Sequence, residues 1–269
     1  MVVPVDDSST PPSTLIRFGA AGGAERRLIC LPFAGGGPAT YRGWTTRLPA
    51  DVEVVAVMLP GRDPSSRVRP PDSIGALVAA TRAALAELHE REPVPFALFG
   101  HSMGALIGFE LTVDLERSGG PAPTHLFVSG RRPPDEPHTG RRIHELDDES
   151  FLDAVQGRYG AIPDVVRNEP ELLALLLPAL RADVRAFETH VPLDRAVVRC
   201  PVHVYGGADD LHPGPAQLTA WQRVAASKIS VRVFDGDHFY LTTSGPLSGG
   251  EALTSDIAAR LTGASMERR

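Results

Sequence analysis

The sequence predicts an α/β fold in which a mostly parallel, doubly wound sheet forms one domain. Short apolar runs bounded by glycine and proline recur along the chain, as expected for strands that are buried on both faces of a sheet. Helix-like stretches lie between many of these runs. A length of 269 residues, of which 42% are hydrophobic and 22% charged, suits a globular domain with an ample core.

Six apolar runs are predicted as strands: 28–31, 52–59, 96–99, 125–128, 202–205 and 229–234. Apolar residues recur at helical spacing in the segments predicted as helices: 74–89, 105–116 and 253–261. Strand and helix therefore alternate over most of the chain, which indicates the doubly wound arrangement.

One segment interrupts this alternation. Residues 131–193, called the insertion below, contain no convincing strand but two leucine-rich helical patterns, at 149–159 and 169–187. An excursion of this length between consecutive strands is usually functional, so we expect a lid, and the alternative is a further layer on the core. The predicted organisation is a flexible tail over residues 1–14 and a single domain over residues 15–269.

Composition excludes several classes of protein. The 27 Lys and Arg against 33 Asp and Glu give a formal charge of −6, so no overall positive field attracts nucleic acid. No apolar run approaches the roughly 18 residues that a membrane span needs, and residues 1–14 lack the basic start and apolar stretch of a secretory signal. The two cysteines, Cys30 and Cys200, lie in or beside strand-like runs. We interpret them as buried, reduced thiols of a cytoplasmic protein.

The pentapeptide Gly100-His101-Ser102-Met103-Gly104 joins a predicted strand to a predicted helix. This is the pattern of a nucleophile elbow, a sharp turn that lifts a serine hydroxyl clear of the sheet. The two flanking glycines leave room for strand and helix to approach closely. Ser102 is therefore the candidate nucleophile.

A serine hydroxyl needs a base, and the base needs an acid that orients it. His238 follows the last predicted strand, and the pair Asp209-Asp210 follows the strand before it. Serine, acid and histidine in this order, each after the carboxyl end of a strand, is the order of the α/β-hydrolases. Among nine histidines, those at 89, 101, 125, 138, 144, 190 and 203 are better explained as core, helix or insertion residues.

The acid is one of two adjacent aspartates. The turn-glycine spacing fits Gly206 to Asp209 as well as Gly207 to Asp210. Leu211-His212-Pro213 resembles the stretch that follows the acid in many hydrolases, so we assign the role to Asp210 and expect Asp209 to be a solvated turn residue.

The oxyanion of the reaction needs two backbone donors. The elbow supplies the N–H of Met103, and the glycine-rich stretch after the first predicted strand supplies a second, for which we choose Ala34 ahead of Phe33. That stretch lacks the spacing of a phosphate-binding loop, and no Cys/His cluster has metal-ligand spacing. We expect no cofactor and no metal.

Four motifs together resemble the type II thioesterases, the free-standing editing enzymes of polyketide synthases and nonribosomal peptide synthetases. They are residues 28–37, the tetrapeptide Leu59-Pro60-Gly61-Arg62, the elbow, and Gly236-Asp237-His238-Phe239. The resemblance runs from about Leu28 to the C-terminal helix. It implies an α/β-hydrolase fold with a helical lid, a triad of Ser102, Asp210 and His238, and hydrolysis of acyl thioesters on the phosphopantetheine arm of carrier proteins.

Other functions remain open on the sequence. A carboxylesterase or lipase acting on oxygen esters and a product-releasing, cyclising thioesterase use the same residues, and a catalytically silent hydrolase fold could serve as a binding module. Carrier proteins are generally acidic, so the pairs Arg131-Arg132 and Arg141-Arg142 are candidates for a docking patch, or else solvated loop charges. We expect a monomer that contacts neither nucleic acid nor membrane.

Overall fold

The computed structural model describes residues 10–19, 23–63, 67–160, 169–211, 213–243, 245 and 248–263. Its seven strands form one sheet in the order β1-β3-β2-β4-β5-β6-β7. The strands are β1 (Thr14–Phe18), β2 (Arg26–Leu31), β3 (Val52–Met58), β4 (Phe96–His101), β5 (Leu126–Ser129), β6 (Val202–Gly207) and β7 (Ser230–Phe234). The six predicted strands are thus confirmed, and they pair in parallel.

The edge strand β1 was not among the predicted strands. It pairs antiparallel with β3, and its side chains are half-buried or exposed. The short stretch Thr14–Phe18 mixes polar and apolar residues, since only one side of this edge strand is covered. It therefore lacks the continuous apolar run that identified the other strands.

The α-helices are α1 (Ile74–Arg91), α2 (Met103–Ser118), α3 (Asp148–Tyr159), α5 (Pro170–Glu188), α6 (Pro215–Leu218) and α7 (Gly249–Thr262). Shorter 3-10 segments are η2 (Pro38–Thr46), η3 (Ile143–Glu145), η4 (Thr219–Val224) and η5 (Tyr240–Thr242). The side chains of Ser73, Asp147 and Ser248 accept hydrogen bonds from backbone N–H groups in the first turns of α1, α3 and α7. These caps explain where the predicted helices begin.

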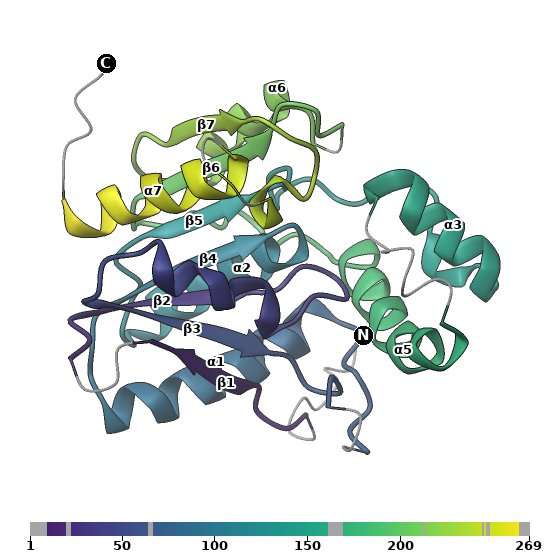
Figure 1. Ribbon diagram of the computed structural model, residues 1–269, viewed down its shortest axis with the longest axis horizontal. Coiled ribbons are helices and arrows are strands. Elements are labelled where there is room, and N and C mark those ends of the chain that lie inside the picture. Colours follow the sequence, from purple (N-terminus) through teal and green to yellow (C-terminus); the bar gives the residue numbers. More distant parts are fainter. Residues whose placement is uncertain are drawn as a thin grey trace.

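Helices cover both faces of the sheet, as Figure 1 shows, with α1 and α2 behind it and η2 and α7 in front. Alternate residues of one strand supply the two cores. In β2, Ile29 and Leu31 pack with residues of α1 and α2, while Leu28 and Cys30 pack with residues of η2 and α7. The sheet is therefore doubly wound, as predicted, and its central strands are buried on both sides.

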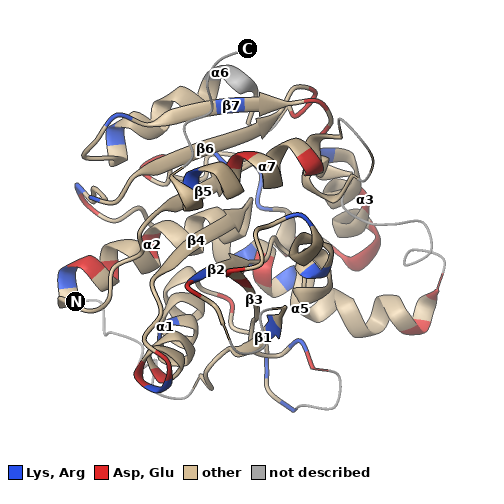
Figure 2. Cartoon of the chain, turned by 60° about the vertical axis from the view of Figure 1, so that its left-hand side comes forward, with Lys and Arg blue, Asp and Glu red and all other residues tan. Residues whose placement is uncertain are grey.

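The insertion forms α3 and α5, which lie together beyond one end of the sheet (Figure 1). Most of the C-terminal turns of α5 are buried, and Val184 and Phe187 join the core that α1 and α2 cover. The N-terminal half is uncharged between Glu171 and Arg181, as the tan stretch of α5 in Figure 2 shows, and exposes Leu175 and Leu176. One end of α5 is thus anchored and the other projects.

Three further predictions concern the N-terminal tail, membrane-spanning helices and the two cysteines. Residues 1–9 of the predicted tail lie outside the described residues. Within the described ranges, every helix falls short of the length or the hydrophobicity that crossing a bilayer requires. Cys30 and Cys200 are buried and unpaired, as predicted.

Candidate active site

Ser102 lies at the turn between β4 and α2 with φ 53° and ψ −114°. A non-glycine residue with positive φ is uncommon and strained, and it persists where the surroundings fix it. The surroundings here are tight, because a Cβ on Gly100 would lie 2.1 Å from the Gly104 carbonyl oxygen. A Cβ on Gly104 would lie 2.3 Å from the Leu31 carbonyl oxygen. The strand, turn and helix predicted for the elbow are present, and both glycines are sterically required.

The loops after β6 and β7 hold each other closely. A Cβ on Gly207 would lie 2.3 Å from the Asp237 carbonyl oxygen, and the Asp209 N–H donates to the Gly236 carbonyl at 3.0 Å. This packing fixes the backbone on which Asp210 and His238 stand.

The Asp210 carboxylate and the His238 ring form a hydrogen bond. His238 Nδ1 lies 2.7 Å from Asp210 Oδ2, and because a carboxylate only accepts, the ring nitrogen donates. The two residues are 4% and 5% exposed, whereas the neighbouring Asp209 is exposed. Of the two candidate acids, the geometry favours Asp210, since this bond sets the His238 tautomer and leaves Nε2 free of the acid.

Ser102 and His238 do not share a hydrogen bond in the part of the chain that the structure describes. The residue before Ser102 nevertheless lies next to His238. The ring centroids of His101 and His238 are 4.8 Å apart. Buried His101 is held by Ser129 Oγ at 2.8 Å, and Ser129 by the Tyr240 hydroxyl at 2.7 Å. Burial lowers the pKa of His101 well below its ordinary value, so this ring stays neutral beneath His238.

The two predicted oxyanion donors belong to backbone segments that touch. Met103 is the first residue of α2, where N–H groups have no intrahelical acceptor. Ala34 lies in a turn closed by the Gly36 N–H, which donates to the Phe33 carbonyl at 2.8 Å. The Phe33 ring contacts Phe239, with centroids 5.0 Å apart, and His101 of the elbow, with centroids 5.9 Å apart. This turn therefore packs beside the elbow and the His238 loop.

Sequence reasoning missed Asp183, which lies on α5 and is fully buried. Its Oδ2 accepts a hydrogen bond from the Gly35 N–H at 2.8 Å, and its Oδ1 forms an ion pair with Arg62. Burial raises the pKa of Asp183, while Arg62 and the Gly35 N–H oppose this shift. The sequence did contain one indication of this role. Asp183 is a single acidic residue on the apolar face of α5 that contains Val184 and Phe187.

A cavity of about 230 Å³ opens at Ser102. Three arginines line it, Arg131, Arg132 and Arg158, together with His138 and the aromatic residues Tyr159 and Phe187. The Tyr159 ring also lies against His238, with centroids 5.3 Å apart. The insertion thus supplies most of the cavity wall, and of its three histidines only His138 contributes to that wall in the described residues.

The predicted docking arginines separate into two groups. Arg131 and Arg132 are half-buried and line the Ser102 cavity, whereas Arg141 and Arg142 are exposed. Only the second pair is fully exposed, whereas the first pair lies partly buried in the wall of the Ser102 cavity.

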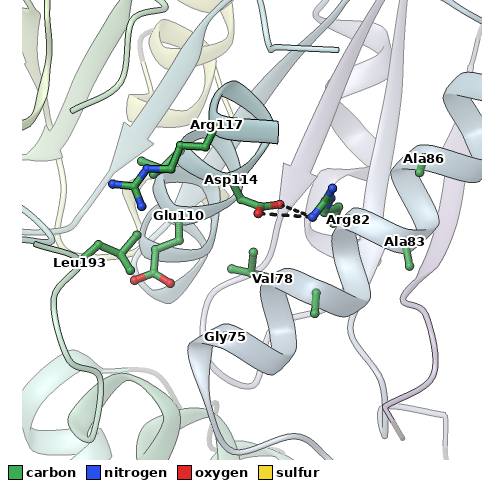
Figure 3. A pocket seen from close by; sticks show the side chains of 11 residues that line it. Gly75, Val78, Arg82, Ala83, Ala86, Glu110, Asp114, Arg117 and Leu193 are labelled. Carbon is green, nitrogen blue, oxygen red and sulfur yellow. Dashed lines mark hydrogen bonds and ion pairs between the residues drawn. The ribbon is translucent and has the colours of Figure 1, made fainter. Parts of the chain in front are cut away.

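A larger cavity of about 500 Å³ lies between α1 and α2, away from Ser102 (Figure 3). Its floor is small and apolar, with Gly75, Val78 and Ala83, and the Arg82–Asp114 ion pair at 3.1 Å crosses it. It contains neither a nucleophile nor a histidine among the residues described. In the same described residues, no cluster of three His, Cys, Asp or Glu side chains could hold a metal ion.

A strained serine after β4, with an acid and a histidine after the last two strands of a parallel sheet, defines a protein of the α/β-hydrolase class. The chain belongs to the thioesterase family, because the family model described as Thioesterase domain matches residues 26–261. It is accordingly a hydrolase that acts on thioesters.

Three similar proteins come from biosynthetic pathways. The gramicidin S biosynthesis protein GrsT of Aneurinibacillus migulanus is 34% identical over 221 residues, 82% of this chain and 85% of that protein. The RedJ thioesterase of the prodiginine pathway in Streptomyces coelicolor is 34% identical with a TM-score of 0.79, covering 96% of this chain and 90% of its own. YbtT, a type II thioesterase from the yersiniabactin NRPS/PKS pathway, is 31% identical with a TM-score of 0.76, and the coverages are 93% and 98%.

Proposed function

We propose that this enzyme is a type II thioesterase that removes stalled or aberrant acyl groups from the phosphopantetheine arms of carrier proteins in polyketide or nonribosomal peptide biosynthesis. The relatives from such pathways support the substrate class. The observation that carries the mechanism is the 2.7 Å hydrogen bond between Asp210 and His238, which stand on loops beside the strained Ser102.

In the first half of the reaction, Ser102 Oγ attacks the thioester carbonyl carbon while His238 Nε2 takes the hydroxyl proton. Asp210 stabilises the resulting imidazolium, and the N–H groups of Met103 and Ala34 donate to the oxyanion. The intermediate collapses as the C–S bond breaks, and the leaving sulfur takes the proton from His238. The products are an acyl-serine ester and the free pantetheine thiol.

In the second half, a water molecule gives a proton to His238 Nε2 and attacks the acyl-serine carbonyl. The bond between Ser102 Oγ and the acyl carbon then breaks, and His238 returns the proton to Oγ. A free acid leaves, and the enzyme is restored without any cofactor.

The experiment compares the wild type with Ser102→Ala on acetyl and propionyl carrier proteins and on the matching pantetheine thioesters. We expect the wild type to turn over these substrates and to show an acyl adduct on the Ser102 peptide by mass spectrometry after rapid quench. We expect Ser102→Ala to lose both the turnover and the adduct. Hydrolysis by Ser102→Ala at the wild-type rate would contradict the mechanism. If the wild type hydrolysed matched oxygen esters faster than thioesters, the proposed substrate class would be contradicted.

A further inference from the structure

His101, the residue before the proposed nucleophile, is a buried histidine around which the loops of the site pack. Its ring contacts Phe33 of the loop after β2 and Phe239 of the loop after β7, with centroids 5.9 Å and 6.0 Å away. The His238 ring is closer, with centroids 4.8 Å apart and an angle of 50° between the ring planes. A Cβ on Gly130 would lie only 2.5 Å from His101 Cε1, so the backbone after β5 also packs against this ring. His101 thus lies where the elbow, the oxyanion loop and the proposed base meet.

Ser129 is bonded to both residues of this part of the elbow. Its carbonyl oxygen accepts the Ser102 N–H at 2.8 Å, and its Oγ lies 2.8 Å from His101 Nδ1. The hydroxyl of the buried Tyr240 lies 2.7 Å from the same Oγ. Burial raises the pKa of Tyr240, so the phenol keeps its proton at neutral pH.

The direction of these hydrogen bonds follows from the protons available. Within the described residues, Ser129 Oγ is the hydrogen-bond partner of the Tyr240 hydroxyl, so the phenol donates to it. The Ser129 hydroxyl then donates to His101 Nδ1, which places the proton of the neutral imidazole on Nε2. Burial lowers the pKa of His101 well below its ordinary value, and the charge that His238 can carry adds to this shift. The ring of His101 is therefore fixed in orientation and stays neutral.

The proposed base needs a support of this kind. The hydrogen bond from His238 Nδ1 to Asp210 fixes one edge of the ring, but a single hydrogen bond leaves the ring free to rotate about the axis of that bond. A second ring packed against it at 4.8 Å restricts the rotation. A charged neighbour would also oppose the imidazolium that forms on His238 during the reaction, whereas the neutral ring of His101 does not.

We propose that His101 is a positioning residue, whose buried ring holds His238 in the orientation in which the base faces Ser102. The inference rests on the proposed function of Ser102 and His238. His101 is fully buried and is not among the described residues that line the Ser102 cavity, so it acts through His238 rather than on the substrate.

His203 is a matched control for burial and hydrogen bonding. It is also a buried histidine, and its Nδ1 also lies 2.8 Å from a serine hydroxyl, that of Ser230. It stands near the start of β6, at the opposite end of that strand from the loop that carries Asp210. A histidine that serves packing alone should therefore behave like His203 when it is replaced, and a positioning residue should not.

The kinetic test replaces each of the two histidines with Asn, which keeps a polar atom near the place of Nδ1 but lacks the ring. His101→Asn should lower kcat on acetyl-pantetheine about 10-fold to 100-fold with KM within about twofold, because a misplaced base impairs the chemical step more than binding. His101→Phe, which keeps a ring against His238 but loses the bond to Ser129, should lose less. His203→Asn should keep kcat within about twofold of the wild type at neutral pH. Equal losses of kcat in the two Asn variants, or an unchanged kcat in His101→Asn, would overturn the proposal.

A milder variant keeps the test decisive if His101→Asn does not fold. Tyr240→Phe removes only the hydroxyl that orients Ser129 and leaves the His101 ring in place. The freed Ser129 hydroxyl can then either donate to His101 or accept from it, so the ring is less fixed. Tyr240→Phe should lower kcat about threefold to tenfold with KM unchanged. A lower melting temperature with an unchanged kcat would assign this chain of hydrogen bonds to stability alone and contradict the proposal.

A second measurement does not depend on the substrate. Proton NMR of the wild type should show a downfield resonance for the Nδ1 proton that His238 donates to Asp210. In His101→Asn this resonance should broaden or disappear, because a ring that turns exposes the proton to exchange with water, and in His203→Asn it should persist. An unchanged resonance in His101→Asn, or its absence from the wild type, would refute the positioning role. If the wild type did not hydrolyse acetyl-pantetheine, the proposed function would fail, and the spectrum would still decide what His101 does to His238.

Discussion

Asp183 of α5 accepts a hydrogen bond from the Gly35 N–H at 2.8 Å, and Gly35 directly follows the candidate oxyanion donor Ala34. One carboxylate of the insertion thus reaches the loop after β2. Its second oxygen pairs with Arg62, which follows β3, so three segments far apart in the sequence meet at this side chain.

We expect Asp183 to position the oxyanion loop. Asp183→Ala should lower kcat about 10-fold to 100-fold with little change in KM. A displaced oxyanion donor reduces stabilisation of the transition state more than it reduces substrate binding. Asp183→Asn, which keeps one oxygen for the Gly35 N–H, should lose less. The control Asp148→Asn breaks an exposed ion pair of the same insertion, to Arg181, and should behave as wild type. A change in KM alone would contradict the positioning role.

The adjacent aspartates offer a matched pair. Asp210→Asn should reduce kcat about 10⁴-fold, because the amide can stabilise the wrong tautomer of His238. Asp209→Asn alters the neighbouring, exposed side chain and should leave kcat within a factor of about two. Steady-state kinetics on an acyl-pantetheine thioester measure both. Reversed results would move the role of the acid to Asp209.

Gly207 should be intolerant of any side chain. A Cβ there would meet the Asp237 carbonyl oxygen at 2.3 Å, so Gly207→Ala must push apart the loops that hold Asp210 and His238. We expect a loss of about 2 kcal/mol or more in the free energy of unfolding and a large loss of activity. Gly157→Ala, in an exposed and open position of α3, should instead stabilise by roughly 0.5–1 kcal/mol. Urea unfolding compares the two, and equal effects would refute the steric argument.

Stability should fall in mild acid partly through His203 of β6. Burial lowers the pKa of His203 to about 3, with Arg260 and His125 adding to the shift. Below about pH 6.5 the unfolded chain therefore binds a proton that the folded chain excludes until near pH 3. Each such histidine removes about 2 kcal/mol of stability at pH 5 relative to pH 7.

Replacing His203 with Phe or Gln should reduce the loss between pH 7 and pH 5 by that amount in denaturant titrations. The two replacements pack differently, so a shared change in pH slope isolates the lost titration. An unchanged slope in both would mean that His203 takes up its proton in the folded state.

The sequence predicted the parts of this molecule that follow from local pattern. Six of the seven strands are recognisable in the sequence as apolar runs. The elbow of Ser102 is recognisable because Gly100 and Gly104 flank the serine at fixed spacing. Chain order alone placed His238 after the last strand. The choice between Asp209 and Asp210 needed the structure, because adjacent residues differ only in the direction of their side chains.

Long-range pairings left no local signal. In the sequence, Asp183 is only one acidic residue in a leucine-rich helix. Its pairing with Arg62 and its hydrogen bond from the Gly35 N–H exist only in the folded chain. In the sequence, Arg131 and Arg132 are equally compatible with a docking patch and with solvated loop charges. Only the packing of α5 places Phe187 against the Arg131 guanidinium and a cavity beside both arginines. Tertiary contacts between segments over 50 residues apart decided these roles.

The strand order places the proposed catalytic residues unevenly across the sheet. Ser102 follows the central strand β4, whereas the proposed acid and base follow β6 and β7. The strand β7 is a border strand with half-exposed side chains. Fraying at that border would carry His238 away from the serine while the remaining strands stayed paired. We therefore expect catalytic competence to be the most fragile property of the molecule, and to vanish at denaturant concentrations that leave most of its secondary structure intact.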